Sequence, residues 1–396
     1  MSEEFKEKLQ KYSEGKLTEE ERKEVELEME KLEAYQVYLE EQLDQEIQAT
    51  GRHQEAHLPQ AALAPGKERT IIRRGKWRAR IINTITVLAA LLVFTVISSI
   101  ITAVFYGTGN RTDIYSDVVS SAIAVSRPNT TVHLSANAKY FFRMELTGRL
   151  QKQIGGEQVD AGDYRQKFLF GWSGSGNYNW TDMRNAGNYY FLYPDAAGGS
   201  SGGGDDNAEW KKLQKLPEGT VAEAYLSLDH LFTTDELLQK LEPLNLLPVW
   251  FAADTGQSSA DTVVTTPLGF PYMPIWHEDD AEMIQESKEK TGWFSSVTSR
   301  SVAYPSVDSY GDGELRNENF IKTLKLLQEH KSLTRQAAPF IQLDEAITYT
   351  QEHGVQLYGA VVTGPVKELL KLKEVSWVSH IRVGEVRLWN WQDRGN

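Results

Sequence analysis

The hydrophobic pattern of the chain contains one long apolar run about a fifth of the way along it, in the stretch WRARIINTITVLAALLVFTVISSI. No Asp, Glu, Lys or Arg occurs in residues 81–110, and residues 87–106 are almost wholly aliphatic or aromatic. About 20 such residues cross the ~30 Å hydrocarbon layer of a bilayer as an α-helix. A buried core helix is usually shorter and polar on one face, and a signal peptide does not follow about 80 residues of chain. The pattern therefore predicts one retained transmembrane helix, over residues 81–106.

Basic residues precede this run. Residues 67–80, called the basic collar below, hold seven Lys and Arg residues against Glu68 alone, a net charge of +6. The segment after the run begins with Arg111, Asp113 and Asp117. Because Lys and Arg favour the cytoplasmic side of a membrane, we expect the N-terminus inside and the C-terminal part outside, in a single-pass protein of the cell membrane. The collar would also attract the anionic lipid head groups of the inner leaflet.

Small residues are spaced by four within the run, in the pairs Ser98 with Thr102 and Ser99 with Ala103. Such spacing lets two transmembrane helices approach closely, so this face is a candidate contact for another helix. Pairs of this kind also arise by chance in single spans. The spacing alone leaves both interpretations open.

Two helices are predicted before the collar. The first has apolar residues at helical spacing until Gly15, which is placed to stop it. The second opens at Thr18, with Glu21 three residues later in a capping-box pattern, and would end at Gly51. The two apolar stripes comprise Phe5, Leu9, Tyr12, Val25, Met29, Leu32, Tyr35, Leu39, Leu43 and Ile47.

Residues 1–50 are strongly acidic, with 16 acidic and 7 basic residues, a net charge of −9 within the whole-chain −13. Two helices in about 50 residues bury too little surface to be stable without disulfides, metal or a partner, and the chain has no cysteine. We therefore expect the stripes to bury against another protein, which the charge predicts to be basic, and not against nucleic acid. A membrane-proximal coiled coil or self-dimer is the alternative.

Residues 51–80 are interpreted as a polar linker that leads into the basic collar. His53 and His57 are four residues apart and could share a helix face as zinc ligands. Glu55, however, is one place away from the H-E-x-x-H pattern, and no third ligand is near. We expect no metal and no cofactor.

The part beyond the span is expected to form an α+β extracellular domain. Residues 107–195 alternate between apolar and polar positions and predict an antiparallel sheet, whereas the Gly/Ser-rich residues 196–206 predict a flexible loop or a domain boundary. Within residues 207–396, the stretches 222–254 and 355–386 each indicate a strand, a short helix and a strand. Two such units suggest a split βαβ, ferredoxin-like sheet. The helices of these units open at Thr234 and Pro365, and further helices are expected at 318–330 and 343–353.

Three motifs of this region were weighed as sites. In GWSGSG, Ser173 follows a glycine, but Ser175 occupies the position of the second glycine of a nucleophile elbow, which favours a turn. In DSYGDGELRNEN, Tyr310 fills a calcium-ligand position and Asn319 replaces the final acid. The run WHEDD is interpreted as a solvated group of charges. We therefore expect no enzyme, and a membrane-tethered cell-surface enzyme or wall-binding protein remains the alternative function.

The order of an acidic helical domain, a basic collar, one span and a large exported domain resembles the membrane-bound anti-sigma factors of Gram-positive bacteria, and most of all the Bacillus anti-sigma-M type. The stretch from GKWRARIINTITVLAALLVFTVISSIITAVFYG through RTDIYSDVVSSAIAVSRPN looks like the sigma factor regulator N-terminal region. The stretch from VQLYGAVVTGPVKELLKL to SHIRVGEVRLW looks like the C-terminal region.

The resemblance implies that the N-terminal helices bind an extracytoplasmic-function sigma factor of the sigma-M kind and cover its surfaces for core polymerase and promoter. It further implies a small companion membrane protein. Many anti-sigma domains bind zinc through a His-x-x-x-Cys-x-x-Cys motif, but His57 and Gln60 stand at the Cys positions after His53, so this chain looks like the zinc-free kind. Carried over to this sequence, the contact face comprises Phe5, Leu9, Tyr12, Val25, Met29, Leu32, Tyr35, Leu39 and Leu43.

Overall fold

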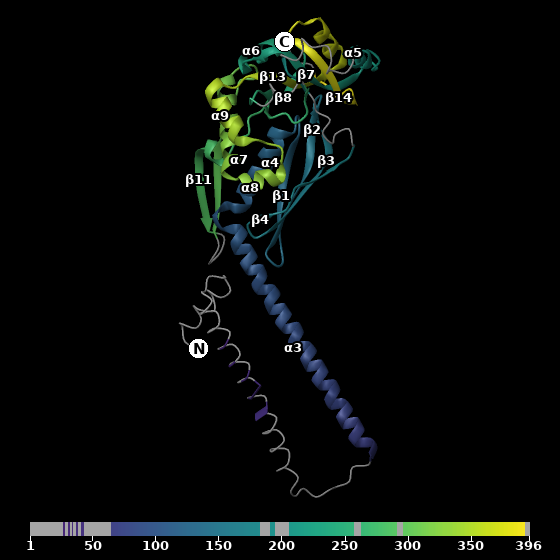
Figure 1. Ribbon diagram of the computed structural model, residues 1–396, viewed down its shortest axis with the longest axis vertical. Helices are drawn as coiled ribbons and strands as arrows, with labels where there is room; N and C mark the ends of the chain where they lie inside the picture. Colours follow the sequence, from purple (N-terminus) through teal and green to yellow (C-terminus); the bar gives the residue numbers. More distant parts are fainter. Residues whose placement is uncertain are drawn as a thin grey trace. The chain divides into compact units, whose positions relative to one another are not determined.

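The computed structural model forms two units, Met1–Val87 and Leu88–Asn396 (Figure 1). It describes seven single positions between residues 27 and 42, and the ranges 65–182, 191–194, 206–256, 263–290 and 296–392. The seven single positions are helical and exposed to solvent, in agreement with the predicted second N-terminal helix at these positions.

The basic collar and the apolar run lie in one helix, α3 (Pro65–Gly107), of 43 residues. Among the described residues, one helical stretch is long and apolar enough to cross a membrane, and only 11% of its most apolar window is buried. Large side chains such as Leu88, Leu92 and Val104 expose 60%, 64% and 61% of their surface. A helix with apolar side chains exposed in this way needs lipid rather than water around it, as the sequence predicted.

The chain breaks its helical course after α3. The short 3-10 helix η1 (Thr108–Asn110) contains Gly109 and Asn110 in the left-handed region, with φ of 69° and 51°, which Gly and Asn adopt more easily than other residues. Helix α4 (Arg111–Ser126) follows, and it is buried along most of its C-terminal half, including Val118 and Ile123. This helix lies within the region that the sequence analysis expected to be β-rich.

The first sheet packs its apolar face on α4 (Figure 1). Its strand order is β1-β2-β3-β4, with β5 also paired to β3, and all pairs are antiparallel. The predicted antiparallel sheet is therefore confirmed. The strands are β1 (Thr131–Lys139), β2 (Arg143–Ile154), β3 (Glu157–Leu169), β4 (Trp172–Ser173) and β5 (Asn177–Trp180).

The second sheet contains the two predicted strand-helix-strand units. Its order is β10-β8-β13-β7-β14, again antiparallel, so the two strands of each unit lie on either side of one strand of the other unit. The first unit's helix begins at Thr234, as expected. Its N-cap is Thr233, whose hydroxyl accepts from Glu236 N at 3.3 Å in a capping box. The units are β7 (Thr220–Phe232), α6 (Thr234–Leu241) and β8 (Leu247–Ala253), then β13 (Leu357–Pro365), α10 (Val366–Lys371) and β14 (Val378–Leu388), with β10 (Gly269–Pro271) at the edge.

Further helices, the hairpin of β11 and β12, and the short pair of β6 with β9 surround these sheets. The helix expected at 343–353 is α9, with the same bounds, and the one expected at 318–330 is the larger part of α7. The elements are α5 (Asp206–Gln214), β6 (Phe191–Leu192), β9 (Val263–Val264), η5 (Glu278–Asp280), β11 (Glu282–Lys290), β12 (Ser296–Ala303), α7 (Gly313–Glu329), α8 (Lys331–Ala337), α9 (Leu343–His353) and η6 (Leu372–Glu374).

One hydrophobic core runs through the C-terminal unit. It joins α4, the first sheet, the second sheet and α7 through residues such as Ile123, Leu146, Leu226, Phe251 and Phe320. The Gly/Ser-rich segment, of which only Asp206 is described, therefore does not separate two cores. The described parts before and after it fold together.

Candidate functional site

The predicted sigma-contact face lies outside the described residues, and so do His53, Glu55 and His57. Between its members, the described side chains of Leu27, Val37 and Tyr38 are exposed by 53%, 56% and 55%. These positions confirm helix but do not test the contact face. The nine residues of that face are Phe5, Leu9, Tyr12, Val25, Met29, Leu32, Tyr35, Leu39 and Leu43.

The basic collar is part of α3 itself. Its described side chains, from Arg73 to Arg80, are all exposed and belong to the same continuous helix as the apolar run. The collar ends where the charge-free run begins. The charge therefore changes sharply at one level along the helix axis. This arrangement suits a helix whose basic end lies among lipid head groups.

The last turns of α3 make a specific contact with the C-terminal unit. Ser98, Thr102 and Tyr106 occur at every fourth position and are only 1%, 2% and 3% exposed, although α3 is otherwise largely exposed. The backbone N–H of Phe142, in the turn between β1 and β2, donates to Thr102 Oγ1 at 3.0 Å. The face with Ser98 and Thr102, a candidate contact for another helix, is therefore occupied by a turn of its own chain.

Tyr106 extends this contact to a second turn. Its hydroxyl donates to the carbonyl oxygens of Phe142 and Phe170, at 3.2 and 3.0 Å, and so bridges the β1–β2 and β3–β4 turns. The ring of Phe142 stacks on that of Phe170 with centroids 4.5 Å apart, and Phe105 meets Phe170 edge-on at 5.4 Å. Two turns from one end of the first sheet thus hold the helix where it leaves the apolar run.

Sequence reasoning missed these aromatic residues. The letters KYFFR, residues 139–143, were included in a strand-like stretch because they continue its apolar character. Their function as a turn depends on Phe141 and Phe142 in the left-handed region, with φ of 60° and 63°. No sequence pattern signals that conformation for phenylalanine, since Gly and Asn are the usual residues there.

A buried ion pair connects the two sheets. Lys152 of β2 lies 3.3 Å from the carboxylate of Glu223 of β7, and the two side chains are only 3% and 1% exposed. The side-chain amide of Asn129 donates to the same carboxylate at 2.8 Å. Trp250 of β8 adds a link to α4 by donating its indole N–H to Ala124 O at 2.8 Å. The helix exit, α4 and both sheets therefore form one mechanically continuous body.

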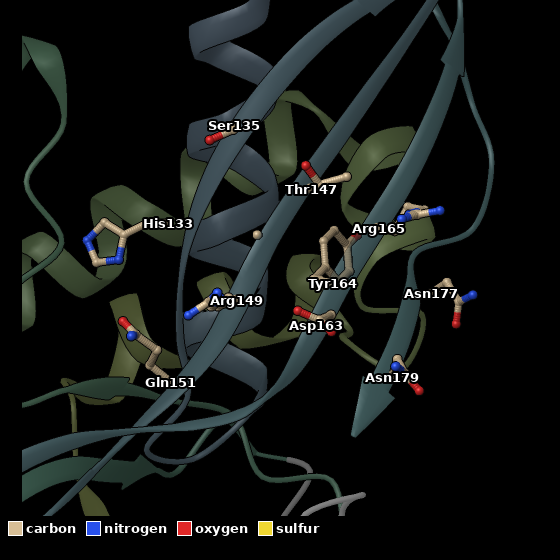
Figure 2. Close-up of a pocket in the computed structure, with 11 residues that line it drawn as sticks. His133, Ser135, Thr147, Arg149, Gln151, Asp163, Tyr164, Arg165, Asn177 and Asn179 are labelled. Atoms are coloured by element: carbon tan, nitrogen blue, oxygen red, sulfur yellow. The ribbon is translucent and has the colours of Figure 1, made fainter. Parts of the chain in front are cut away.

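The open face of the first sheet carries a polar hollow of about 790 Å³ (Figure 2). Charged and amide side chains project from adjacent strands into it. Among them, Arg149 pairs with Asp160 at 3.2 Å. Pockets for small organic ligands are mostly apolar, so this set matches a hydrated sheet face better than a built pocket. The labelled lining residues are His133, Ser135, Thr147, Arg149, Gln151, Asp163, Tyr164, Arg165, Asn177 and Asn179.

The serine motif and the calcium-like motif both form part of the folded structure rather than a site. Ser173 belongs to the two-residue strand β4, and the next serine, Ser175, donates to Gln336 Oε1 of α8 at 3.0 Å. In the calcium-like motif, α7 already begins at Gly313, and the Asp312 carboxylate accepts from Asp308 N at 2.7 Å. Neither segment has the strand-turn-helix or ligand-loop geometry that its chemistry requires.

The run WHEDD is exposed at Glu278 and Asp279, in agreement with the expected solvated group of charges, but it is buried at His277. His277 is only 7% exposed, because its ring packs inward and its Nε2 lies 3.1 Å from Thr323 Oγ1. Burial lowers the pKa of His277, and the hydrogen bond from Lys322 lowers the pKa of Asp279. The run attaches its loop to α7. In the described part of the chain, no group of three His, Asp or Glu residues is arranged to hold a metal ion.

Comparison with known proteins agrees with this layout. The sigma factor regulator N-terminal family matches residues 69–159, which include most of the collar, the apolar run, α4 and the first two strands. The sigma factor regulator C-terminal family matches residues 213–385. The chain is 26% identical over 400 residues to the probable anti-sigma-M factor YhdL of Bacillus subtilis (strain 168), covering 99% of this chain and 100% of that protein. No solved structure matches the chain. The chain therefore belongs to the family of anti-sigma factors that carry the sigma factor regulator N-terminal and C-terminal regions.

Proposed function

We propose that this protein holds an extracytoplasmic-function sigma factor inactive at the inner face of the membrane until an envelope signal received outside weakens its grip. The observation that carries the proposal is the similarity to an anti-sigma-M factor over the full length of both chains. The position of the basic collar supports an N-terminus inside the cell and a C-terminal domain outside.

The acidic N-terminal helices are the part that binds the sigma factor. Their net charge of −9 would accelerate capture of a basic partner, and burial of their apolar stripes would supply the affinity. A bound sigma factor of the sigma-M kind then has no free surface for core polymerase. Because one chain carries both the binding segment and the span, the captured sigma factor is also held away from the chromosome.

The signal would reach these helices through α3. The helix is continuous from Pro65 to Gly107, and the C-terminal domain holds its far end at Ser98, Thr102 and Tyr106. A change in that domain therefore acts on a rigid rod whose other end carries the collar. Exposed faces of the span, with Leu88 and Leu92 among their residues, leave room for the companion membrane protein that the family resemblance implies.

We also assign the second sheet to the ferredoxin-like class. The assignment is supported by two β-α-β units whose strands interleave in the order β8-β13-β7-β14, so that all neighbouring strands are antiparallel. The edge strand β10 is an addition to that plan. We propose a regulatory rather than an enzymatic role on the similarity to an anti-sigma-M factor and not on the sheet, because a scaffold of this kind carries many different functions.

The contact face is tested by Leu32→Asp and Leu39→Asp, each in the full chain. A carboxylate placed in an apolar interface loses its water without gaining a partner, so each change should weaken binding by at least about 2 kcal/mol, or roughly 30-fold. Co-purification of the sigma factor from detergent-solubilised membranes should fall, and transcription from its target promoters should rise.

The matched control is Leu27→Asp, which adds the same charge to the same helix at a described position that is 53% exposed and outside the predicted face. It should retain the sigma factor and keep the promoters silent. Undiminished retention by both test variants, or an equal loss in the control, would contradict the proposed contact face.

A further inference from the structure

Exposed aromatic side chains gather at one end of the first sheet, next to the helix exit. The turn between β1 and β2 exposes 63% of Tyr140 and 40% of Phe141, and the turn between β3 and β4 exposes 37% of Phe170 and 81% of Trp172. We call these two turns, residues 140–142 and 169–172, the aromatic tips. Figure 1 shows the β1–β2 turn beside the upper part of α3. A grouped apolar surface of this kind marks an interaction site.

The backbone conformation at the aromatic tips is unfavourable for the residues found there. Among the described residues, six other than glycine have left-handed backbone conformations: three are Asn or Asp, which tolerate them, and three are phenylalanines at the tips. This conformation costs a phenylalanine about 1–2 kcal/mol, and Gly or Asn would form the same turns more easily. The turn conformation therefore does not account for these residues: Phe142 and Phe170 stack on each other, whereas Phe141 is left exposed by 40%. The three phenylalanines are Phe141, Phe142 and Phe170.

The length of the charge-free run places the first tip relative to the bilayer. Residues 81–110 would extend about 45 Å as a helix, ~15 Å more than the hydrocarbon layer. If that layer begins at Arg80, it ends near residue 100 after about 20 residues. Phe94 lies inside this limit by about 9 Å, at 1.5 Å per residue. Its ring stacks on Phe141 with centroids 5.8 Å apart, so the first tip lies below the lipid surface.

Other positions of the helix do not remove the tip from the lipid. Shifting the helix so that the hydrocarbon layer begins before Arg78 would place Arg78 and Arg80 in hydrocarbon. The cost is about 2.5–3.5 kcal/mol each at the bilayer centre. Tilting the helix lengthens the part within the layer and brings the tip deeper. The second tip meets α3 at Phe105, about five residues beyond the limit near residue 100, which is the level of the head groups.

The residues around the tips match this depth. Lys139 and Arg143 bracket the first tip. Lys139 pairs with Glu145, whereas the long side chain of Arg143 can reach back to the head groups. Arg111 lies over the ring of Phe105 at 4.4 Å, at the level of the second tip. Trp172, the most exposed residue of the second tip, has the amphipathic ring typical of membrane interfaces.

We propose that the aromatic tips are a lipid-binding surface: the turn 140–142 inserts into the hydrocarbon of the leaflet through which α3 leaves the membrane, and Trp172 lies at the interface beside it. The partner is the bilayer itself, because the tips continue the surface of the span. The C-terminal domain is then held by the lipid as well as by its helix. The inference holds for either orientation of the chain and does not rest on the proposed sigma-factor binding.

The absence of cysteine from the chain allows a direct test. Tyr140→Cys and Phe141→Cys are made separately in the full chain, labelled with a nitroxide and reconstituted into liposomes of phosphatidylglycerol and phosphatidylethanolamine. Phe340→Cys is the control, since Phe340 is 72% exposed and lies between α8 and α9 rather than in either tip. Electron paramagnetic resonance with molecular oxygen, which enters lipid, and a water-soluble nickel complex reports the depth of each label.

For labels at the first tip, the ratio of oxygen collisions to nickel collisions should be at least tenfold higher than for the label at 340. Two sites are used so that a local disturbance at one does not decide the result, and tryptophan fluorescence verifies the fold of each variant. Lipid exposure of either label supports the proposal. Nickel access at both sites equal to that at 340 overturns it. Protection of both sites from both reagents also overturns it, because protein would then cover the turn.

Discussion

The two sheets of the C-terminal domain are both antiparallel, but they are buried in different ways. In β1 of the first sheet, exposed residues alternate with buried or partly buried ones, whereas all nine residues of β13 in the second sheet are buried. The first sheet is covered on one face by α4. The second is covered on both, with Leu357 and Val362 in the main core and Tyr358 and Val361 in a separate cluster around Phe191. The pattern of apolar residues in a strand therefore indicates whether one or both faces of its sheet are covered, and not only that a strand forms.

The difference also separates two functions. The first sheet keeps one face in water and brings its two turns to the helix exit, so it acts as the part that contacts the membrane segment. The second sheet is enclosed and makes no such contact through its central strands. Polar groups between the two sheets, such as Lys152 with Glu223, decide whether they move as one body.

The largest effect on stability is expected from Lys152→Met, which removes the ion pair between the two sheets. It leaves the Glu223 carboxylate, only 1% exposed, without its cation, and removing one partner of a buried pair costs about 3–5 kcal/mol. Urea unfolding of the full chain in detergent, followed by tryptophan fluorescence, measures the loss. The control is Lys152→Met combined with Glu223→Leu, which removes both charges and should cost less. A loss below about 1 kcal/mol in the single variant would mean that the pair does not hold the sheets together.

A smaller effect is expected from Thr363→Val in β13. The Thr363 hydroxyl accepts from Gly155 N at 2.7 Å and donates to Ala222 O at 3.0 Å, so it joins the enclosed sheet to the β2–β3 turn. Valine keeps the shape but leaves that buried N–H without an acceptor, which costs about 1–3 kcal/mol in the same unfolding experiment. Thr363→Ser preserves the hydroxyl and should cost less than valine. Equal stability of the two variants would deny the hydroxyl this role.

The smallest effect is expected from Arg149→Ala on the open face of the first sheet. Its pair with Asp160 is exposed on both sides, with side chains 73% and 49% accessible, and such pairs contribute little. The free energy of unfolding should change by no more than about 0.5 kcal/mol. A loss above about 1 kcal/mol would show that the polar hollow is a packed structural feature and would weaken the contrast between the sheets.

Much of the fold followed from local pattern. The span, the first sheet, the two strand-helix-strand units and α9 each have a periodicity that short-range sterics and burial impose. The helix α4 did not follow from local pattern. Its buried residues include the adjacent Val118 and Val119 and the continuous run from Ser121 to Val125. A helix enclosed on several sides loses the one-sided stripe by which helices are found. The hairpin of β11 and β12 was missed because its strands are largely polar.

The candidate site was less predictable than the fold. The sequence indicated a small-residue face at Ser98 and Thr102, but its occupant is Phe142, 40 residues from Thr102 along the chain. The apolar stripes of the acidic N-terminal segment were visible as periodicity, and their contact face remains a prediction outside the described residues. Residues that meet over such separations carry no local signature of each other.

The sequence by itself determined that this chain holds a run long and apolar enough to cross a membrane, which end of that run is basic, and where strands and most helices form. Those properties depend on charge and on spacing between near neighbours, which one chain displays directly. Only the tertiary structure decided that Phe141 meets Phe94, that Lys152 meets Glu223, and that one core unites both sheets. Such contacts depend on the path by which the chain returns, and burial energy selects that path over the whole domain rather than at any one position.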